Sequence, residues 1–166
     1  PKSDRNEMYN RIKSYFQNAA GGTIILKNIQ LLNFEKQSVF LHILSEEHPD
    51  VRMICTANGT LMKMLAEEDF RDNLFYMLRQ SGITVPPLRE MTEDIPDIAD
   101  YLLAIYAHKT SQVRKRLDAS AIKALKLYPW PGNIRELKDT ILMAAFHADG
   151  DIISADDLVF SDIQPE

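Results

Sequence analysis

The chain has 166 residues, of which 45% are hydrophobic and 26% charged, and its formal net charge is −5. This length corresponds to one domain, or to one domain with a small appendage. The composition is that of an ordinary globular protein and excludes a disordered tail, a collagen and a disulfide scaffold. The acidic balance argues against a nucleic-acid clamp along the whole chain, because phosphate binding needs concentrated Lys and Arg.

Features that bear on location point to the cytoplasm. The single cysteine, Cys55, excludes an intramolecular disulfide and fits a reducing compartment. No apolar run approaches 18 residues, so we expect no membrane-spanning helix and no membrane partner. The N-terminal residues are charged and lack the apolar core of a signal peptide.

Strands and helices alternate in the first half of the chain. Three short, β-branched runs are typical of strands buried on both faces of a parallel sheet. The spacing of apolar residues between them predicts helices, and Asn33 is placed to cap one of these. In chain order we predict a helix over 4–19, a strand over 23–26, a helix over 34–46, a strand over 51–57, helices over 61–68 and 70–80, and a strand over 82–85. This order predicts a parallel sheet with helices on its faces.

The second half of the chain has only helical patterns. We predict helices over 94–110, 118–127, 133–148 and 155–160, with Asp118 and Ser154 as caps. The fold expected is therefore an α/β part over 1–90 followed by an all-α part over 91–166. Three strands make a thin sheet, because doubly wound sheets usually have five or more. Either the protein is minimal, or further strands precede this sequence.

Four segments, in this order, resemble the AAA+ (sigma-54 interaction) domain of sigma-54-dependent transcriptional activators, the bacterial enhancer-binding proteins. They are Gly21–Leu26 with Lys27-Asn28-Ile29 (Walker B), Phe70–Leu78 (arginine-finger helix), Val85–Glu90 with Asp94-Ile95-Pro96 (hinge) and Tyr128–Leu137 (sensor II). The set covers about residues 11–160. The resemblance implies the C-terminal part of a Rossmann-like AAA+ α/β subdomain, followed by a helical lid.

The chain departs from this family at the end of its Walker B segment. The family has Asp-Glu there: the Asp helps to hold magnesium, and the Glu orients the attacking water. Here the two positions are Lys27 and Asn28. A protonated lysine cannot bind a metal ion, and asparagine has no basic carboxylate. The resemblance therefore implies a degenerate centre with no catalytic residue and no metal site, and magnesium is not expected.

Three other residues are marked for nucleotide binding by the resemblance: Asn58 in sensor I, Arg71 in the finger helix and Arg135 in sensor II. The Walker A pattern Gly-x-x-x-x-Gly-Lys-Ser/Thr does not occur in the 166 residues, so weak binding of ATP or ADP is expected. Plain structural roles stay open as alternatives. Arg135 could pair with Asp139 on a helix surface, and Arg71 could pair locally with Asp72 or Asp69.

The interpretation that we favour is part of a degenerate AAA+ domain of a bacterial transcription regulator, which serves oligomerisation and regulation with ATP hydrolysis weak or lost. The partners expected are a second copy of the chain, as a dimer or larger homo-oligomer, and RNA polymerase holoenzyme. DNA would be bound only by a domain outside this chain. Two alternatives are an active ATPase that remodels sigma-54 holoenzyme, and an interaction module that senses a nucleotide or second messenger.

Overall fold

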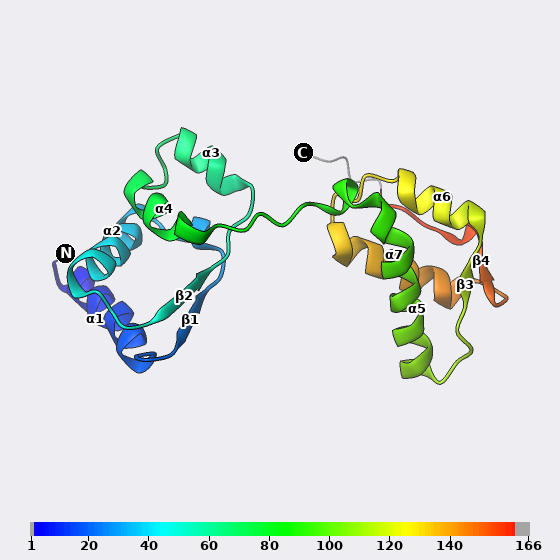
Figure 1. Ribbon diagram of the computed structural model, residues 1–166, viewed down its shortest axis with the longest axis horizontal. Coiled ribbons are helices and arrows are strands. Elements are labelled where there is room, and N and C mark those ends of the chain that lie inside the picture. Colours follow the sequence, from blue (N-terminus) through cyan, green and yellow to red (C-terminus); the bar gives the residue numbers. More distant parts are fainter. Residues whose placement is uncertain (1, 162–166) are drawn as a thin grey trace. The chain divides into compact units, whose positions relative to one another are not determined.

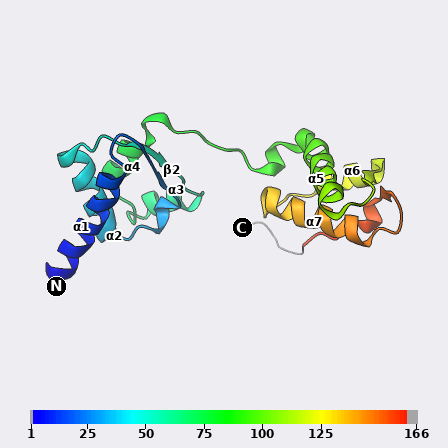
Figure 2. The same ribbon diagram turned by 90° about the horizontal axis from the view of Figure 1, so that it is seen from below.

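The computed structural model describes residues 2–161 of the chain. They form two compact units: the first ends at Ile83 and the second begins at Thr84. Figures 1 and 2 show the helices and strands of each unit. The change from one unit to the next comes earlier in the chain than the boundary expected after residue 90. Over the described residues, none of the helices has the length and apolar character needed to cross a membrane.

The first unit contains the helices and strands expected up to residue 80, with slightly different ends. They are α1 (Lys2–Asn18), β1 (Thr23–Leu26), α2 (Phe34–His42), β2 (Arg52–Cys55), α3 (Thr60–Ala66) and α4 (Asp72–Leu78). A π-helical turn, Ile43–Glu47, continues α2. Asn33 caps α2 as predicted, because its side chain accepts a hydrogen bond from the Lys36 N–H at 3.0 Å.

The two strands pair in parallel, from Thr23 opposite Arg52 to Leu26 opposite Cys55. The prediction of a third strand over 82–85 is wrong, because these residues have no regular secondary structure. Ile83 is 91% exposed, with no strand beside it in the described part of the chain. The β-branched residues in this segment favour a strand only where a neighbouring strand offers cross-strand contacts, so their local preference has no effect here.

The sheet is covered on one face only, which differs from the expectation of strands buried on both faces. The side chains that pack on the hydrophobic core alternate along the strands: Ile24, Leu26, Met53 and Cys55. The opposite face carries Ile25, which is 58% exposed, and Ile54, which is 42% exposed. The buried core behind the sheet comes mainly from helices, with Ile12, Phe16, Val39 and Phe40 among its members.

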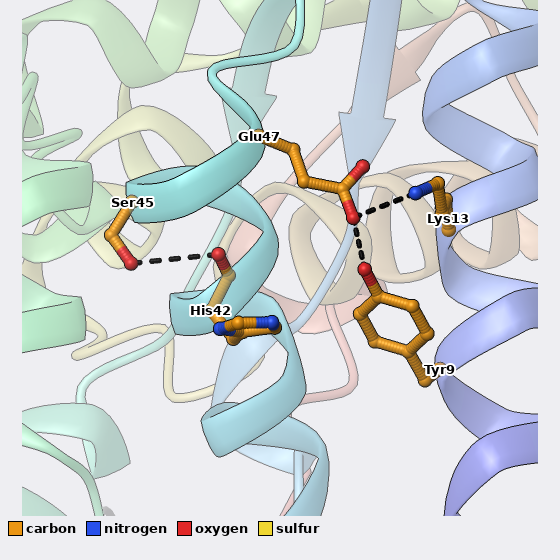
Figure 3. A network of polar contacts seen from close by, with 5 residues as sticks. All are labelled: Tyr9, Lys13, His42, Ser45 and Glu47. Atoms are coloured by element: carbon orange, nitrogen blue, oxygen red, sulfur yellow. Dashed lines mark hydrogen bonds and ion pairs between the residues drawn. The ribbon is translucent and has the colours of Figure 1, made fainter.

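A network of polar contacts fastens α1 to the π-helical turn (Figure 3). The Tyr9 hydroxyl donates a hydrogen bond to the Glu47 carboxylate, and Lys13 Nζ lies 2.9 Å from Glu47 Oε1. The Tyr9 ring also lies 5.8 Å from the ring of His42. The hydrogen bonds from Tyr9 and Lys13 hold the pKa of Glu47 below its usual value. Glu47 is the last residue of the π-helical turn, so the wider geometry of this turn determines where the Glu47 carboxylate contacts α1.

The second unit is built from helices, together with one very short pair of strands. Its elements are α5 (Ile95–Thr110), β3 (Arg116–Leu117), α6 (Ala119–Leu127), α7 (Asn133–His147) and β4 (Ile152–Ile153). A 3-10 turn, Ala155–Asp157, stands in place of the helix predicted over 155–160. Asp118 caps α6 as predicted, because its Oδ1 accepts from the Ala121 N–H at 2.8 Å, and Ser154 forms a capping box with Asp157.

The core of the second unit centres on Trp130, which is fully buried. Its indole N–H donates to the backbone oxygen of Leu125 at 2.8 Å, so the polar atom of this large side chain is satisfied inside the core. Apolar residues from all three helices pack around it, among them Leu103, Leu125, Leu137 and Ile141.

The Asn33 cap predicts a measurable loss of stability. Asn33→Ala removes the acceptor for an unpaired helix N–H, and we expect the free energy of unfolding of the first unit to fall by about 1 kcal/mol. Urea unfolding followed by circular dichroism measures this change. Asn33→Ser is the matched control, since it keeps an acceptor; an equal loss in both variants would contradict the capping role.

The Glu47 network predicts a pH-dependent effect of mutation. Because its pKa is lowered in the folded state, the contribution of Glu47 is present above the unfolded pKa, about 4.3, and is lost as the pH falls through the folded pKa. We expect Glu47→Gln to lower the midpoint of thermal unfolding at pH 7, and the difference from wild type to shrink below about pH 4. Glu46→Gln, at the exposed neighbouring position, is the control and should change the midpoint little.

Candidate functional site

The carboxyl ends of β1 and β2 meet at one edge of the sheet. Lys27 and Asn28 follow β1, while Thr56 and Asn58 follow β2, and Leu26 lies opposite Cys55 in the pairing. Ligands of open α/β sheets bind beyond the carboxyl ends of the strands. Three of the residues predicted from the sequence, Lys27, Asn28 and Asn58, therefore lie at the edge where a ligand site is expected.

Backbone and side-chain hydrogen bonds tie the two strand ends together. The Asn28 N–H donates to Thr56 Oγ1 at 3.1 Å, and the Ile29 N–H donates to the Thr56 oxygen at 3.0 Å. The Thr56 N–H donates in turn to the Leu26 oxygen at 2.9 Å. Asn28 adopts a left-handed conformation, with φ of 58°, which asparagine tolerates better than most residues. The backbone that carries Lys27 is thus fixed on both sides.

The charge at this edge is positive. Lys27 is exposed and has no ion-pair partner within 4 Å among the described residues. The side chains of Lys27, Asn28, Thr56 and Asn58 supply an ammonium, amides and a hydroxyl, without a carboxylate. Magnesium prefers carboxylate and water oxygens, so these residues do not fit it. Residues 2–161 also contain no group of three or more His, Cys, Asp or Glu placed to hold a metal ion.

Asn58 has a local structural role in this geometry. Its Oδ1 accepts a hydrogen bond from the Thr60 N–H at 3.1 Å, where α3 begins. The side chain itself is exposed. One acceptor of the predicted nucleotide-binding residue is therefore engaged in the turn between β2 and α3.

Arg71 is held by the first turn of α2. The Arg71 N–H donates to Gln37 Oε1 at 2.8 Å, and its guanidinium carbon lies 3.8 Å from the centre of the Phe34 ring. Its Nε is buried and has no hydrogen-bond partner among the described residues. No ion pair with Asp72 or Asp69 forms in that part of the chain, so the local pairing considered from the sequence is absent.

Gln37 is a site residue that the sequence analysis did not identify. It is fully buried, and its Nε2 donates to the backbone oxygens of Leu32 at 2.8 Å and Asp69 at 3.0 Å while its Oε1 serves Arg71. Three backbone groups from two segments thus depend on one side chain. The signal was present in the sequence, because Gln37 lies three residues before Phe40 on the apolar face of α2.

Arg135 lies in the first turn of α7, in the second unit, and is exposed. It forms no ion pair with Asp139 in the described structure, which leaves its charge unpaired. The other predicted site residues, Lys27, Asn28, Asn58 and Arg71, belong to the first unit.

Family comparisons cover almost the whole chain. The model of the "Sigma-54 interaction domain" matches residues 2–88, and the model of the "AAA+ ATPase lid domain" matches residues 89–164. The two matches follow one another in the order in which the α/β and helical units occur.

Individual relatives agree with the family models. The nitrogen fixation protein AnfA of Azotobacter vinelandii is 33% identical over 85% of this chain and 28% of its own length. The DNA-binding transcriptional regulator NtrC of Bradyrhizobium sp. (strain RP501 Parasponia) is 33% identical over 87% of this chain and 32% of its own length. The chain therefore spans about a third of the length of these relatives.

A solved structure gives the same result for the fold. The crystal structure of NtrX from Brucella abortus in complex with ADP matches with a TM-score of 0.78 and 26% identity, over 87% of this chain and 36% of NtrX. The expected fold class, a partial Rossmann-like AAA+ sheet with flanking helices and a helical lid, is confirmed. With its first unit matched by one model and its second by the other, the chain belongs to the sigma-54 interaction domain family of AAA+ transcriptional regulators.

Proposed function

We propose that this chain is part of a degenerate AAA+ domain in a bacterial transcription regulator, and that it serves oligomerisation and regulation with ATP hydrolysis weak or lost. Residues 1–90 would supply the α/β part and residues 91–166 the lid. The observation that carries the proposal is the chemistry of the strand edge, where Lys27 and Asn28 follow β1, Thr56 and Asn58 follow β2, and none of these four described residues has a carboxylate.

The proposed loss of hydrolysis follows from what phosphoryl transfer requires. The reaction depends on a bound cation that offsets the developing charge, and on a group that orients the attacking water. An ammonium at Lys27 repels a dication, and the Asn28 amide cannot accept a proton from water. Neither change prevents phosphate contact, because lysine binds phosphate as a point charge.

Nucleotide binding is therefore proposed as a regulatory event. In the first unit, ATP or ADP would contact the unpaired cations Lys27 and Arg71 and the retained Asn58, with weak affinity and without magnesium. For Arg135, which belongs to the second unit, a contact with phosphate is proposed separately. Support comes from NtrX of Brucella abortus, whose structures in complex with ADP and with ATP both match this chain.

The stacked and unpaired Arg71 also favours a second candidate function, an interaction module that senses a nucleotide or second messenger.

The partners proposed are further copies of the chain and sigma-54 RNA polymerase holoenzyme. Membership of the sigma-54 interaction domain family supports the second of these. DNA binding is assigned to a domain outside this chain, in keeping with the net charge of −5.

The proposal predicts the outcome of restoring the acidic pair. In the full-length protein we expect magnesium-dependent ATP hydrolysis at background level, and a rise of about tenfold or more for the double variant Lys27→Asp, Asn28→Glu. Phosphate release with and without EDTA measures it. Lys36→Asp, an exposed lysine on α2, is the control for the change of charge. Robust magnesium-dependent turnover by the wild type would show that the proposed loss of hydrolysis is wrong.

The Arg71 geometry predicts two graded effects. Arg71 and Phe34 line a hollow of about 380 Å³ together with Glu68, Phe70, Asp72 and Asn73. We expect Arg71→Ala to weaken ADP- or ATP-dependent self-association about tenfold, since the charge-assisted hydrogen bond proposed between its guanidinium and a nucleotide phosphate would be lost. Phe34→Leu should weaken it about threefold, because only the stacking contact is removed.

The control for this pair lies on the neighbouring helical segment. Arg79 also lies over an aromatic ring, with its guanidinium carbon 5.4 Å from the centre of Phe75. Sedimentation with added nucleotide measures each variant. If Arg79→Ala weakens assembly as much as Arg71→Ala, the effect is one of general charge and the assignment of Arg71 is wrong.

A further inference from the structure

The turn Tyr128–Asn133, which leads into α7, has an unfavourable backbone. Trp130 has φ of 51° and Asn133 has φ of 53°, both in the left-handed region. For a bulky residue such as tryptophan this region is an outlier, and it persists only where the surroundings enforce it. The contacts that enforce it come from three places: the core, the chain that enters the second unit, and the chain near Ser161.

The entering chain is bonded directly to the end of the turn. The Leu88 N–H donates to Asn133 Oδ1 at 2.9 Å, across 45 positions in the sequence. Leu88 is itself buried in the core. The Asn133 N–H donates back to the Trp130 oxygen at 2.9 Å, which closes the turn. The left-handed conformation of Asn133 therefore depends on groups on both sides of it.

The last described residues pack on the beginning of the same turn. The Phe160 ring stacks on Tyr128, with centres 4.5 Å apart and planes inclined by 21°, and meets the edge of Trp130 at 5.9 Å. The Tyr128 hydroxyl lies 2.7 Å from the Ser161 backbone oxygen, 2.8 Å from Glu136 Oε1 and 3.1 Å from Ser161 Oγ, and its single proton can serve one acceptor at a time. The position of Ser161 thus affects which bond Tyr128 makes.

Glu136 connects these contacts to the helix. Its Oε2 accepts from the Gly132 N–H at 2.7 Å, and its Oε1 also accepts from the Ser161 hydroxyl. A Cβ on Gly132 would lie 2.7 Å from the Cβ of Glu136, so only glycine fits this close approach. Glu136 directly follows Arg135 in the first turn of α7. A displacement of the Glu136 carboxylate therefore also affects the helical turn that carries Arg135.

We propose that the Tyr128–Asn133 turn is a conformational device that couples the segments at Leu88 and Ser161 to the start of α7. Displacement of the chain at Leu88 or at Ser161 loosens the helix turn that carries Arg135. The coupling itself rests on the contacts above; only its consequence for a nucleotide rests on the function proposed for Arg135.

Two variants test the coupling from opposite ends. Tyr128→Phe removes the hydroxyl but keeps the ring stacked on Phe160 and in edge contact with Trp130. Asn133→Gly removes the acceptor for Leu88 but keeps a residue that tolerates positive φ. Tyr101→Phe, at a tyrosine 66% exposed on α5, is the matched control.

Amide hydrogen exchange of the full-length protein is the measurement. We expect each variant to speed exchange at Gly132 and Glu136 about tenfold, in line with the loss of one hydrogen bond. Coupling further requires that Tyr128→Phe also speeds exchange at Leu88. The hydrogen bonds of the Tyr128 hydroxyl to Glu136 and Ser161 do not involve Leu88, so a faster exchange there has to be transmitted through the turn. The double variant should exchange less than the product of the two single effects.

The outcomes separate this proposal from the preceding one. Unchanged exchange at Leu88 in Tyr128→Phe, or effects of the two changes that simply multiply, would overturn the coupling. Titration with ADP then tests the consequence: Tyr128→Phe should weaken ADP binding several-fold in wild-type background but not in Arg135→Ala. If the wild type binds no ADP, the nucleotide role of Arg135 is wrong, and the exchange data still decide on the coupling.

Discussion

The parallel pairing of β1 with β2 is the constraint on which the candidate site depends. It sets Leu26 opposite Cys55, so that the residues after each strand, among them Lys27, Asn28 and Asn58, come to a single edge. The side chain and backbone of Thr56 then fix the residues after β1 through two hydrogen bonds. A shift of one residue in this register would turn the core-facing side chains to the exposed face, so the hydrophobic core behind the sheet also holds the site in place.

Polar side chains with several partners give both units their specific geometry. In the first unit, Gln37 is fully buried and satisfies three backbone groups, among them the Arg71 N–H. In the second unit, Glu136 joins Gly132, Tyr128 and Ser161. At the fully buried Gln37, loss of one partner leaves buried groups unsatisfied, which costs more than a single net hydrogen bond. In each unit, then, one polar side chain lies beside an arginine proposed to bind nucleotide.

The pattern of charges explains why the strand edge suits an anion better than a dication. Lys27 is exposed and unpaired, and its neighbours at the edge are amides and a hydroxyl. Arg71 and Arg135 likewise form no ion pairs among the described residues. Each of these cations is consistent with a ligand group that brings negative charge, and phosphates carry it in the form that lysine and arginine recognise.

Local patterns in the sequence were enough to locate most elements. Apolar spacing placed the seven α-helices of the described chain, and the caps at Asn33 and Asp118 could be named because their hydrogen bonds join residues three positions apart. The ordered motifs identified the family, and the two substitutions at Lys27 and Asn28 needed no coordinates to be recognised as chemically different from an acidic pair.

Contacts between distant segments were beyond the reach of such patterns. The segment 82–85 has the composition of a strand but lacks a partner, and the helix predicted over 155–160 shortens to one turn so that Phe160 reaches Tyr128. The roles of Gln37, Phe34 and Glu136 depend on groups far away in the sequence, 34 positions in the case of Gln37 and Arg71. Residue type and spacing report local backbone preference, whereas these contacts exist only once packing has brought the segments together.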